Sequence, residues 1–123
     1  MQAFYEVYVL NTVSLRYFSV FGPRQKDSTY RGVIAIWLGN KIRKENLIVF
    51  GDGIQSRDFI YIKDVVRANL LAAETDVPGK IFNIGAGSPI TLYELGTIML
   101  GISNNKNLKI IKFLTNLPLY FII

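Results

Sequence analysis

The stretch that most constrains the fold is residues 50–64, with the sequence FGDGIQSRDFIYIKD. The apolar run 47–50 ends in a Gly-Asp-Gly tripeptide. This pattern predicts a strand and a tight turn, because glycine tolerates positive φ and aspartate bonds to the local backbone. The alternating residues 59–62 predict a second strand. Asp64 opens an apolar-periodic segment and is predicted to be the N-cap of a helix over 64–74.

Arg57 and Asp58 stand between the turn and the second strand. The guanidinium of Arg57 has a planar fork of donors that suits a phosphate group. The alternative interpretation is a local structural ion pair between Arg57 and Asp58. These residues taken alone favour the ion pair.

The rest of the chain predicts strands that alternate with helices. The strands are expected over 12–21, 80–84 and 108–113, and the helices over 1–9, 33–44 and 91–100. Thr91 and Glu94 predict a capping box at the start of the last helix. The alternation favours an α/β fold. The strands at 12–21 and 80–84 have the near-continuous apolar character of buried parallel strands.

Composition excludes several classes of site. The 123 residues contain neither cysteine nor histidine. Disulfides, thiolate metal sites, Ser-His-Asp catalysis and Cys-His catalysis are therefore excluded within this chain, and we predict no metal site. Neither a signal peptide nor an apolar run of about 18 residues is present. We therefore expect a cytoplasmic protein with no membrane partner.

The formal net charge of +5 raises the question of nucleic-acid binding. The basic residues concentrate in the segments 41–44 and 106–112, where they stand singly among apolar residues. This spacing is typical of solvated faces, and no RNP-like or helix-turn-helix pattern accompanies it. We therefore expect no nucleic-acid partner.

Three motifs carry a family resemblance: LRYFSVFGPRQ at 15–25, VFGDGIQSRDFIYIKDVVRA at 49–68 and IFNIGAGSPITLYEL at 81–95. In this order and spacing they resemble the C-terminal half of extended short-chain dehydrogenase/reductases. The similarity is greatest to the NAD-dependent nucleotide-sugar epimerase/dehydratase group, typified by UDP-glucose 4-epimerase. The resemblance covers roughly residues 1–100.

The resemblance implies an α/β fold that combines a partial Rossmann-type sheet, made of its C-terminal strands, with the small α/β substrate-binding portion. It implies NAD as the cofactor of the parent family and a UDP-sugar or another nucleotide sugar as the substrate. Residues 1–105 would form the substrate-binding part, and residues 106–123 a divergent or truncated tail. A homodimer is compatible with the resemblance, which leaves the sugar and the choice between epimerase and dehydratase open.

The resemblance also implies ligand contacts. The backbone of Tyr17 and Phe18 would approach the nicotinamide of the cofactor. Ser19 stands where most relatives have an asparagine that helps to hold the diphosphate of the substrate. Arg57 matches the arginine that binds this diphosphate.

Further contacts would surround the nucleotide. Val33 belongs to a helix start beside it, where Ala35 replaces the usual proline. Leu47, Val49 and Phe50 match a strand that walls the base, and core packing is the alternative role of Leu47 and Phe50. Asn83 and Asp64 would bond to the backbone.

Two parts of the family's machinery are absent from these residues. The Gly-Asp-Gly and Gly-Ala-Gly turns lack the third glycine of a pyrophosphate-binding turn. No tyrosine is followed four residues later by lysine, the pair that performs acid/base chemistry in the family. We therefore predict no catalytic residue, a chain that starts just downstream of the catalytic pair, no NAD binding by this chain alone, and no activity alone.

Two alternatives remain open at this point. The chain could be a non-catalytic module that recruits nucleotide sugars or a partner chain. It could also be a truncated gene product without a function, which its high mean hydropathy and the apolar residues 117–123 would fit.

Overall fold

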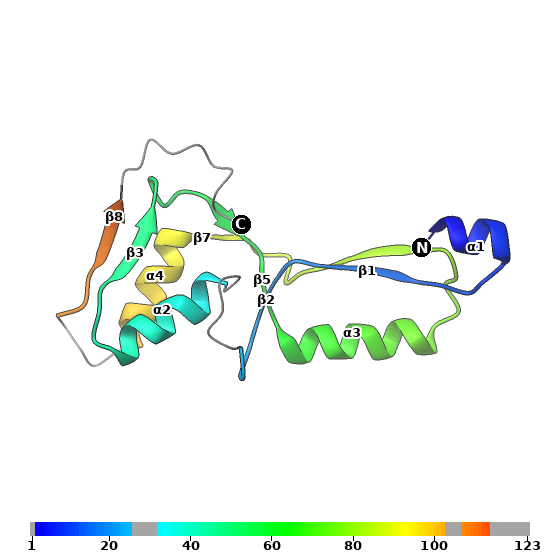
Figure 1. Ribbon diagram of the computed structural model, residues 1–123, viewed down its shortest axis with the longest axis horizontal. Helices are drawn as coiled ribbons and strands as arrows, with labels where there is room; N and C mark the ends of the chain where they lie inside the picture. The colour runs from blue at the N-terminus through cyan, green and yellow to red at the C-terminus, as the bar shows by residue number, and fades with distance from the viewer. Residues whose placement is uncertain (1, 26–31, 103–106, 114–123) are drawn as a thin grey trace. The chain divides into compact units, whose positions relative to one another are not determined.

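The computed structural model describes residues 2–25, 32–102 and 107–113 (Figure 1). The chain divides into two compact units, each made of two separate stretches. Unit 1 contains residues 1–22 and 58–88, and unit 2 contains residues 23–57 and 89–123. In the described residues, helices alternate with short strands, and three of their four strand pairs are parallel. The predicted α/β class is therefore confirmed.

Unit 1 contains two parallel strand pairs. Its elements are α1 (Gln2–Tyr8), β1 (Ser14–Tyr17), β2 (Ser19–Phe21), β5 (Phe59–Tyr61), α3 (Ile62–Glu74) and β6 (Ile81–Ile84). β1 pairs with β6, and β2 pairs with β5 (Figure 1). The prediction of one strand over 12–21 is wrong, because the segment is divided at Phe18. The N–H of Phe18 donates to Ile84, whereas the N–H of the next residue, Ser19, donates to Asp58.

The first strand pair is also more exposed than its composition predicts. Phe82 in β6 is 39% exposed and Tyr17 in β1 is 47% exposed. Among the described residues of unit 1, the buried apolar side chains are those of Ile60 and Val65. The prediction that 12–21 and 80–84 are buried strands is therefore wrong for these residues. Two short strands, unlike a larger sheet, bury little of their own surface.

The start of α3 differs from the prediction. The helix begins at Ile62, and Tyr61 is its N-cap, with an extended backbone of φ −75° and ψ 141° and no side-chain capping bond. The predicted N-cap role of Asp64 is wrong, because the chain passes directly from β5 into the helix. Asp64 lies in the first turn, where its negative charge complements the helix dipole.

In the described part of unit 2, two helices pack against one parallel strand pair. Its elements are α2 (Val33–Ile42), β3 (Leu47–Phe50), β4 (Ser56–Arg57), β7 (Ile90–Thr91), α4 (Leu92–Gly101) and β8 (Ile110–Phe113). β3 pairs in parallel with β8, and β4 pairs antiparallel with β7. Most of the buried apolar side chains in the described residues belong to this unit: Trp37, Leu47, Val49, Leu92, Leu95, Met99 and Leu108.

The predicted turn after β3 is confirmed. Gly51 and Gly53 have φ of 83° and 79°, a region that favours glycine. The side chain of Asp52 accepts from the N–H of Ile54 at 3.0 Å. The carbonyl of Gly53 accepts from the N–H of Tyr93 at 3.1 Å. The turn is therefore fastened both internally and to the first turn of α4.

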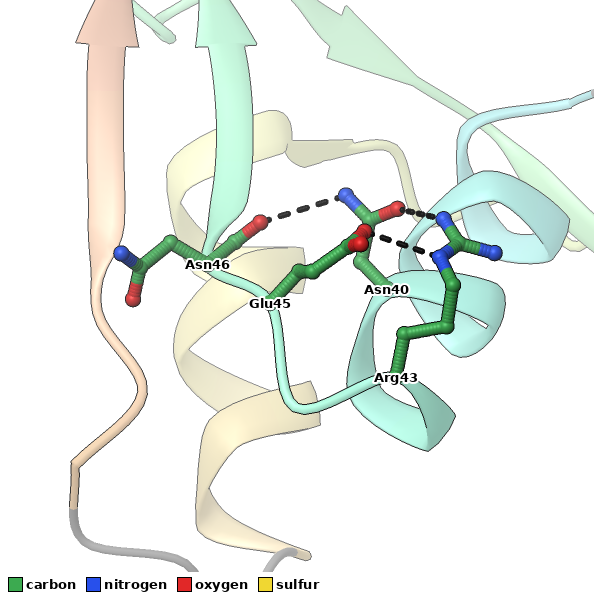
Figure 2. A network of polar contacts seen from close by, with 4 residues as sticks. All are labelled: Asn40, Arg43, Glu45 and Asn46. Carbon is green, nitrogen blue, oxygen red and sulfur yellow. Dashed lines mark hydrogen bonds and ion pairs between the residues drawn. The ribbon is translucent and has the colours of Figure 1, made fainter.

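A polar network joins α2 to the following strand (Figure 2). Asn40 is buried, and its amide donates to the carbonyl of Asn46 at 3.2 Å. Its oxygen accepts from Arg43 at 2.7 Å, and Arg43 also donates to Glu45 at 2.9 Å. The side chain of Asn46 accepts from the N–H of Lys109 at 2.9 Å. The network therefore connects α2 with the residues that precede β3 and β8.

The predicted capping box of α4 is confirmed. The hydroxyl of Thr91 accepts from the N–H of Glu94 at 3.1 Å, and the carboxylate of Glu94 accepts from the N–H of Thr91 at 2.7 Å. The pKa of Glu94 lies below its ordinary value. The main cause is the hydrogen bond from the backbone N–H of Thr91, and the second is the hydrogen bond from the Thr91 hydroxyl.

Replacing Thr91 with alanine is expected to destabilise unit 2 by about 1 kcal/mol, because the N–H of Glu94 loses its partner. Urea unfolding measures this loss. Because the pKa of Glu94 is lowered in the fold, its stabilising contribution is present above the ordinary glutamate pKa and is lost as the pH falls through the lowered pKa. Glu94→Gln should remove this pH dependence, and an unchanged acid profile in that variant would contradict the assignment.

Two regions of the sequence analysis are only partly described. Of the predicted tail 106–123, the structure describes 107–113, which contains β8, and the remainder lies outside the described residues. Among the described helices, none has both the length and the apolar character that crossing a membrane requires.

Candidate functional site

In unit 1 the predicted ligand residues lie where the chain leaves β1. Tyr17 and Phe18 are 47% and 46% exposed. The hydroxyl of Tyr17 donates to the side-chain oxygen of Asn69 in α3 at 2.8 Å. The amide of Asn69 in turn donates to the carbonyl of Val65 at 2.7 Å. Tyr17 is therefore oriented by α3, and Phe18 presents an aromatic surface beside it.

Asp58 connects three segments at this place. One carboxylate oxygen accepts from the N–H of Ala86 at 2.8 Å, and the other accepts from the N–H of Gly87 at 2.9 Å. Its main-chain oxygen accepts from the N–H of Ser19 at 3.0 Å. The described residues contain no ion pair between Asp58 and Arg57, so the ion-pair interpretation is not supported. Sequence reasoning missed this role, because the partners of Asp58 are 28 and 29 residues away.

In unit 2 the predicted phosphate ligand Arg57 lies on β4 and is exposed. β4 pairs with β7, where Arg57 stands opposite Ile90. Its guanidinium donates to the adjacent carbonyl of Ser56 at 3.2 Å. No carboxylate among the described residues pairs with it. The fork of donors therefore keeps most of its hydrogen-bonding capacity.

The predicted base contacts of β3 lie on opposite faces of the strand. Leu47 and Val49 are 0% and 1% exposed, so the structure places both side chains in the core of unit 2. Phe50 faces the other way and is 47% exposed, with its ring centroid 6.3 Å from that of Phe113 in β8. Val33 is the first residue of α2 and is half-buried. Phe50 is thus the predicted contact on β3 that is open to a ligand.

The described glycines do not form a pyrophosphate cradle. Positive φ occurs at Gly51, Gly53, Gly79 and Gly87. A dinucleotide-binding turn leads from a strand directly into a helix, whose first N–H groups meet the pyrophosphate. None of these four glycines lies between a strand and the first turn of the next helix. The described residues therefore do not fit the pyrophosphate of NAD.

Unit 1 also contains a cavity of about 540 Å³ beside the C-terminal half of α3. Its walls include Asn69 and the apolar side chains of Val13 and Leu15, with Glu74 and Asp76 among the other lining residues. Groups of three or more acidic, histidine or cysteine side chains suited to a metal ion do not occur in the described ranges.

Comparisons with known proteins identify the family. The model of the NAD dependent epimerase/dehydratase family matches residues 1–85. A putative UDP-glucose 4-epimerase of Methanocaldococcus jannaschii is 39% identical over 93 residues, which are 76% of this chain and 30% of that protein. A UDP-N-acetyl-alpha-D-glucosaminuronate decarboxylase of Bacillus cytotoxicus is 37% identical over 91 residues, which are 74% of this chain and 28% of that protein.

Solved structures show the same relationship. UDP-N-acetylglucosamine 4-epimerase from Methanobrevibacter ruminantium, in complex with UDP-N-acetylmuramic acid, superimposes with a TM-score of 0.83 at 38% identity and covers 90% of this chain. UDP-glucose 4-epimerase from Thermotoga maritima, with UDP-glucose, gives a TM-score of 0.79 at 38% identity over 88% of this chain. This chain covers 36% and 35% of these two structures.

The chain thus spans about a third of the length of its relatives, and the whole length of those proteins includes regions that these residues do not match. The structural likeness extends over nearly all of the chain and establishes a Rossmann-like α/β fold. The match of the family model covers more than half of the sequence. On these grounds the chain belongs to the NAD dependent epimerase/dehydratase family.

Proposed function

We propose that this chain is the substrate-binding part of a nucleotide-sugar epimerase or dehydratase, and that it binds a UDP-sugar. The observation that carries the proposal is the exposed guanidinium of Arg57, which has no acidic partner among the described residues. The ligands of the two similar solved structures support the choice of a UDP-sugar, since these structures contain UDP-N-acetylmuramic acid and UDP-glucose.

Each predicted contact has a role in this proposal. Arg57 holds the diphosphate through its fork of donors. Phe50 offers its exposed ring to the base, and the buried side chains of Leu47 and Val49 hold β3 in place beneath it. Val33 borders the nucleotide at the start of α2. Ser19, which is half-buried in β2, contributes a hydroxyl.

The cofactor enters the proposal only through Tyr17 and Phe18. The backbone of these two residues, where the chain leaves β1, is the part that we assign to a nicotinamide contact. Since the described residues do not fit the pyrophosphate, we derive no chemical step through NAD. The 123 residues contain no tyrosine–lysine pair at the family's spacing. We therefore propose that they bind the substrate without converting it.

Replacing Arg57 with glutamine is expected to weaken UDP-glucose binding by about tenfold or more, because the loss of a charge-assisted bidentate contact costs about 1.5–3 kcal/mol. Titration of the ¹⁵N-labelled chain followed by NMR measures the affinity. Arg67→Gln is the matched control, since Arg67 is an exposed arginine of α3. Arg57→Lys keeps the charge without the fork and should give an intermediate loss.

The opposite outcomes are clear. The absence of saturable shifts in the wild-type chain would overturn the proposed function. If Arg57→Gln and the wild type bind UDP-glucose with equal affinity, Arg57 does not contact the ligand. Conversion of UDP-glucose by the purified 123-residue chain in the presence of NAD would show that these residues hold a complete active site.

A further inference from the structure

Asp58 uses its whole carboxylate inside unit 1. It is half-buried, and its two oxygens accept from two successive amides, those of Ala86 and Gly87, at 2.8 and 2.9 Å. We call this arrangement the Asp58 clamp. A carboxylate that accepts backbone N–H groups makes charge-assisted hydrogen bonds, which are shorter and stronger than neutral ones. The clamp therefore fixes the turn after β6 against the residue that precedes β5.

The residue before the clamped amides lies against Phe18. A Cβ atom on Gly85 would be 2.4 Å from Cδ2 of Phe18 and 2.5 Å from Oδ2 of Asp58. Such short distances mean that the backbone of Gly85 is in direct contact with both side chains. The N–H of Phe18 donates to the carbonyl of Ile84 at 3.0 Å. Phe18 is thus held from the side by Gly85 and along its backbone by the end of β6.

The same aspartate also fixes the next residue. Ser19 donates its N–H to the main-chain oxygen of Asp58, and from there β2 runs parallel to β5. The strand with which this segment pairs therefore changes from β6 to β5 between Phe18 and Ser19. Asp58 makes hydrogen bonds on both sides of this change of partner. Its main chain holds β2, and its side chain holds the turn that follows β6.

We propose that Asp58 is a positioning residue, whose clamp on the turn 85–87 sets the location of Phe18 and Ser19 for their ligands. The proposal rests on the proposed function for the ligand contacts of these two residues. It adds a role for Asp58 that the exposed neighbour Arg57 does not have. Arg57 touches the substrate, whereas Asp58 acts only through the segments it holds.

The clamp itself is tested in the wild-type chain and in Asp58→Asn. In the wild type, scalar couplings across the hydrogen bonds should connect the amide nitrogens of Ala86 and Gly87 to the carboxyl carbon of Asp58. In Asp58→Asn, hydrogen exchange at these two amides should accelerate by about tenfold relative to the wild type. Asp64→Asn is the matched control, because it removes the same charge from an exposed position in the same unit.

Two measurements test the positioning role: the contacts of the Phe18 ring and the affinity for UDP-glucose. Nuclear Overhauser contacts between the Phe18 ring and Gly85 should be present in the wild type and in Asp64→Asn and lost in Asp58→Asn. UDP-glucose affinity should fall by about threefold to tenfold in Asp58→Asn. Asp58→Glu, which keeps the carboxylate, should recover part of both signals.

The outcomes separate the two claims. Missing couplings in the wild type would overturn the clamp even if Asp58→Asn failed to fold. Loss of amide protection with unchanged Phe18 contacts and unchanged UDP-glucose affinity would overturn the positioning role. A wild-type chain that does not bind UDP-glucose would overturn the proposed function and the ligand part of this inference, while the Phe18 contacts would still decide whether Asp58 positions that residue.

Discussion

Replacing Leu47 with alanine should destabilise unit 2 by about 3 kcal/mol, because a fully buried leucine leaves a cavity that its neighbours fill only in part. Leu47 is 0% exposed and lies in the same core as Trp37, which is 1% exposed. Since Trp37 is the single tryptophan of the chain, its fluorescence reports unfolding of this core directly. Urea unfolding followed by this signal measures the loss.

The matched control is the next residue of the same strand. Ile48 points to the opposite face of β3 and is 40% exposed. Ile48→Ala should therefore cost about half as much, roughly 1–1.5 kcal/mol. Equal losses in the two variants would mean that β3 is not oriented as described. The same pair of variants separates core packing from ligand contact, since Leu47→Ala should change UDP-glucose affinity only through stability.

Replacing Gly85 with alanine should destabilise unit 1 by about 3 kcal/mol, near the upper end for overpacking a site that cannot expand. The added methyl group would overlap both the Phe18 ring and the Asp58 carboxylate, at 2.4 and 2.5 Å. Gly85 does not have positive φ, so the cost is steric. Amide exchange of β5 and β6, measured residue by residue, should show the loss in unit 1.

Gly87→Ala is the informative comparison for this variant. Gly87 has φ of 77° and no atom within 4 Å of an added Cβ. Its replacement therefore costs about 1 kcal/mol from backbone conformation alone. A loss in Gly87→Ala as large as that in Gly85→Ala would contradict the close contact between Gly85 and Phe18.

The sequence predicts best those elements whose signals are local. The turn after β3 needs only two glycines and an aspartate, and the capping box of α4 needs only Thr91 and Glu94. Both are confirmed because their hydrogen bonds join residues a few positions apart. The helices α2 and α4 have the same advantage.

The errors concern contacts between distant segments. The run 12–21 has the composition of one strand, yet its first part pairs with β6 and its second part with β5. Neither partner is encoded in the run itself. The exposure of β1 and β6 likewise depends on how many strands lie beside them. The predicted N-cap of α3 is wrong because the helix follows β5 without a connecting loop.

In the candidate site, too, the sequence predicts some residues and misses those that depend on contacts between distant segments. The family resemblance directs attention to Arg57 and Phe50, and the structure leaves both side chains exposed. The resemblance does not distinguish Phe50 from Leu47 and Val49, because alternation along β3 decides which side chains enter the core. Asp58 was absent from the predicted site residues, since its partners follow a separate turn far along the chain.

The interleaving of the two units has a consequence for biosynthesis. The paired residues of β1 and β6 are 67 positions apart, as Ser14 pairs with Ile81, so this pairing forms several seconds after β1 is synthesised at about 5–20 residues per second. The order of translation therefore delays the closing of unit 1, because residues 23–57 are synthesised between its two stretches.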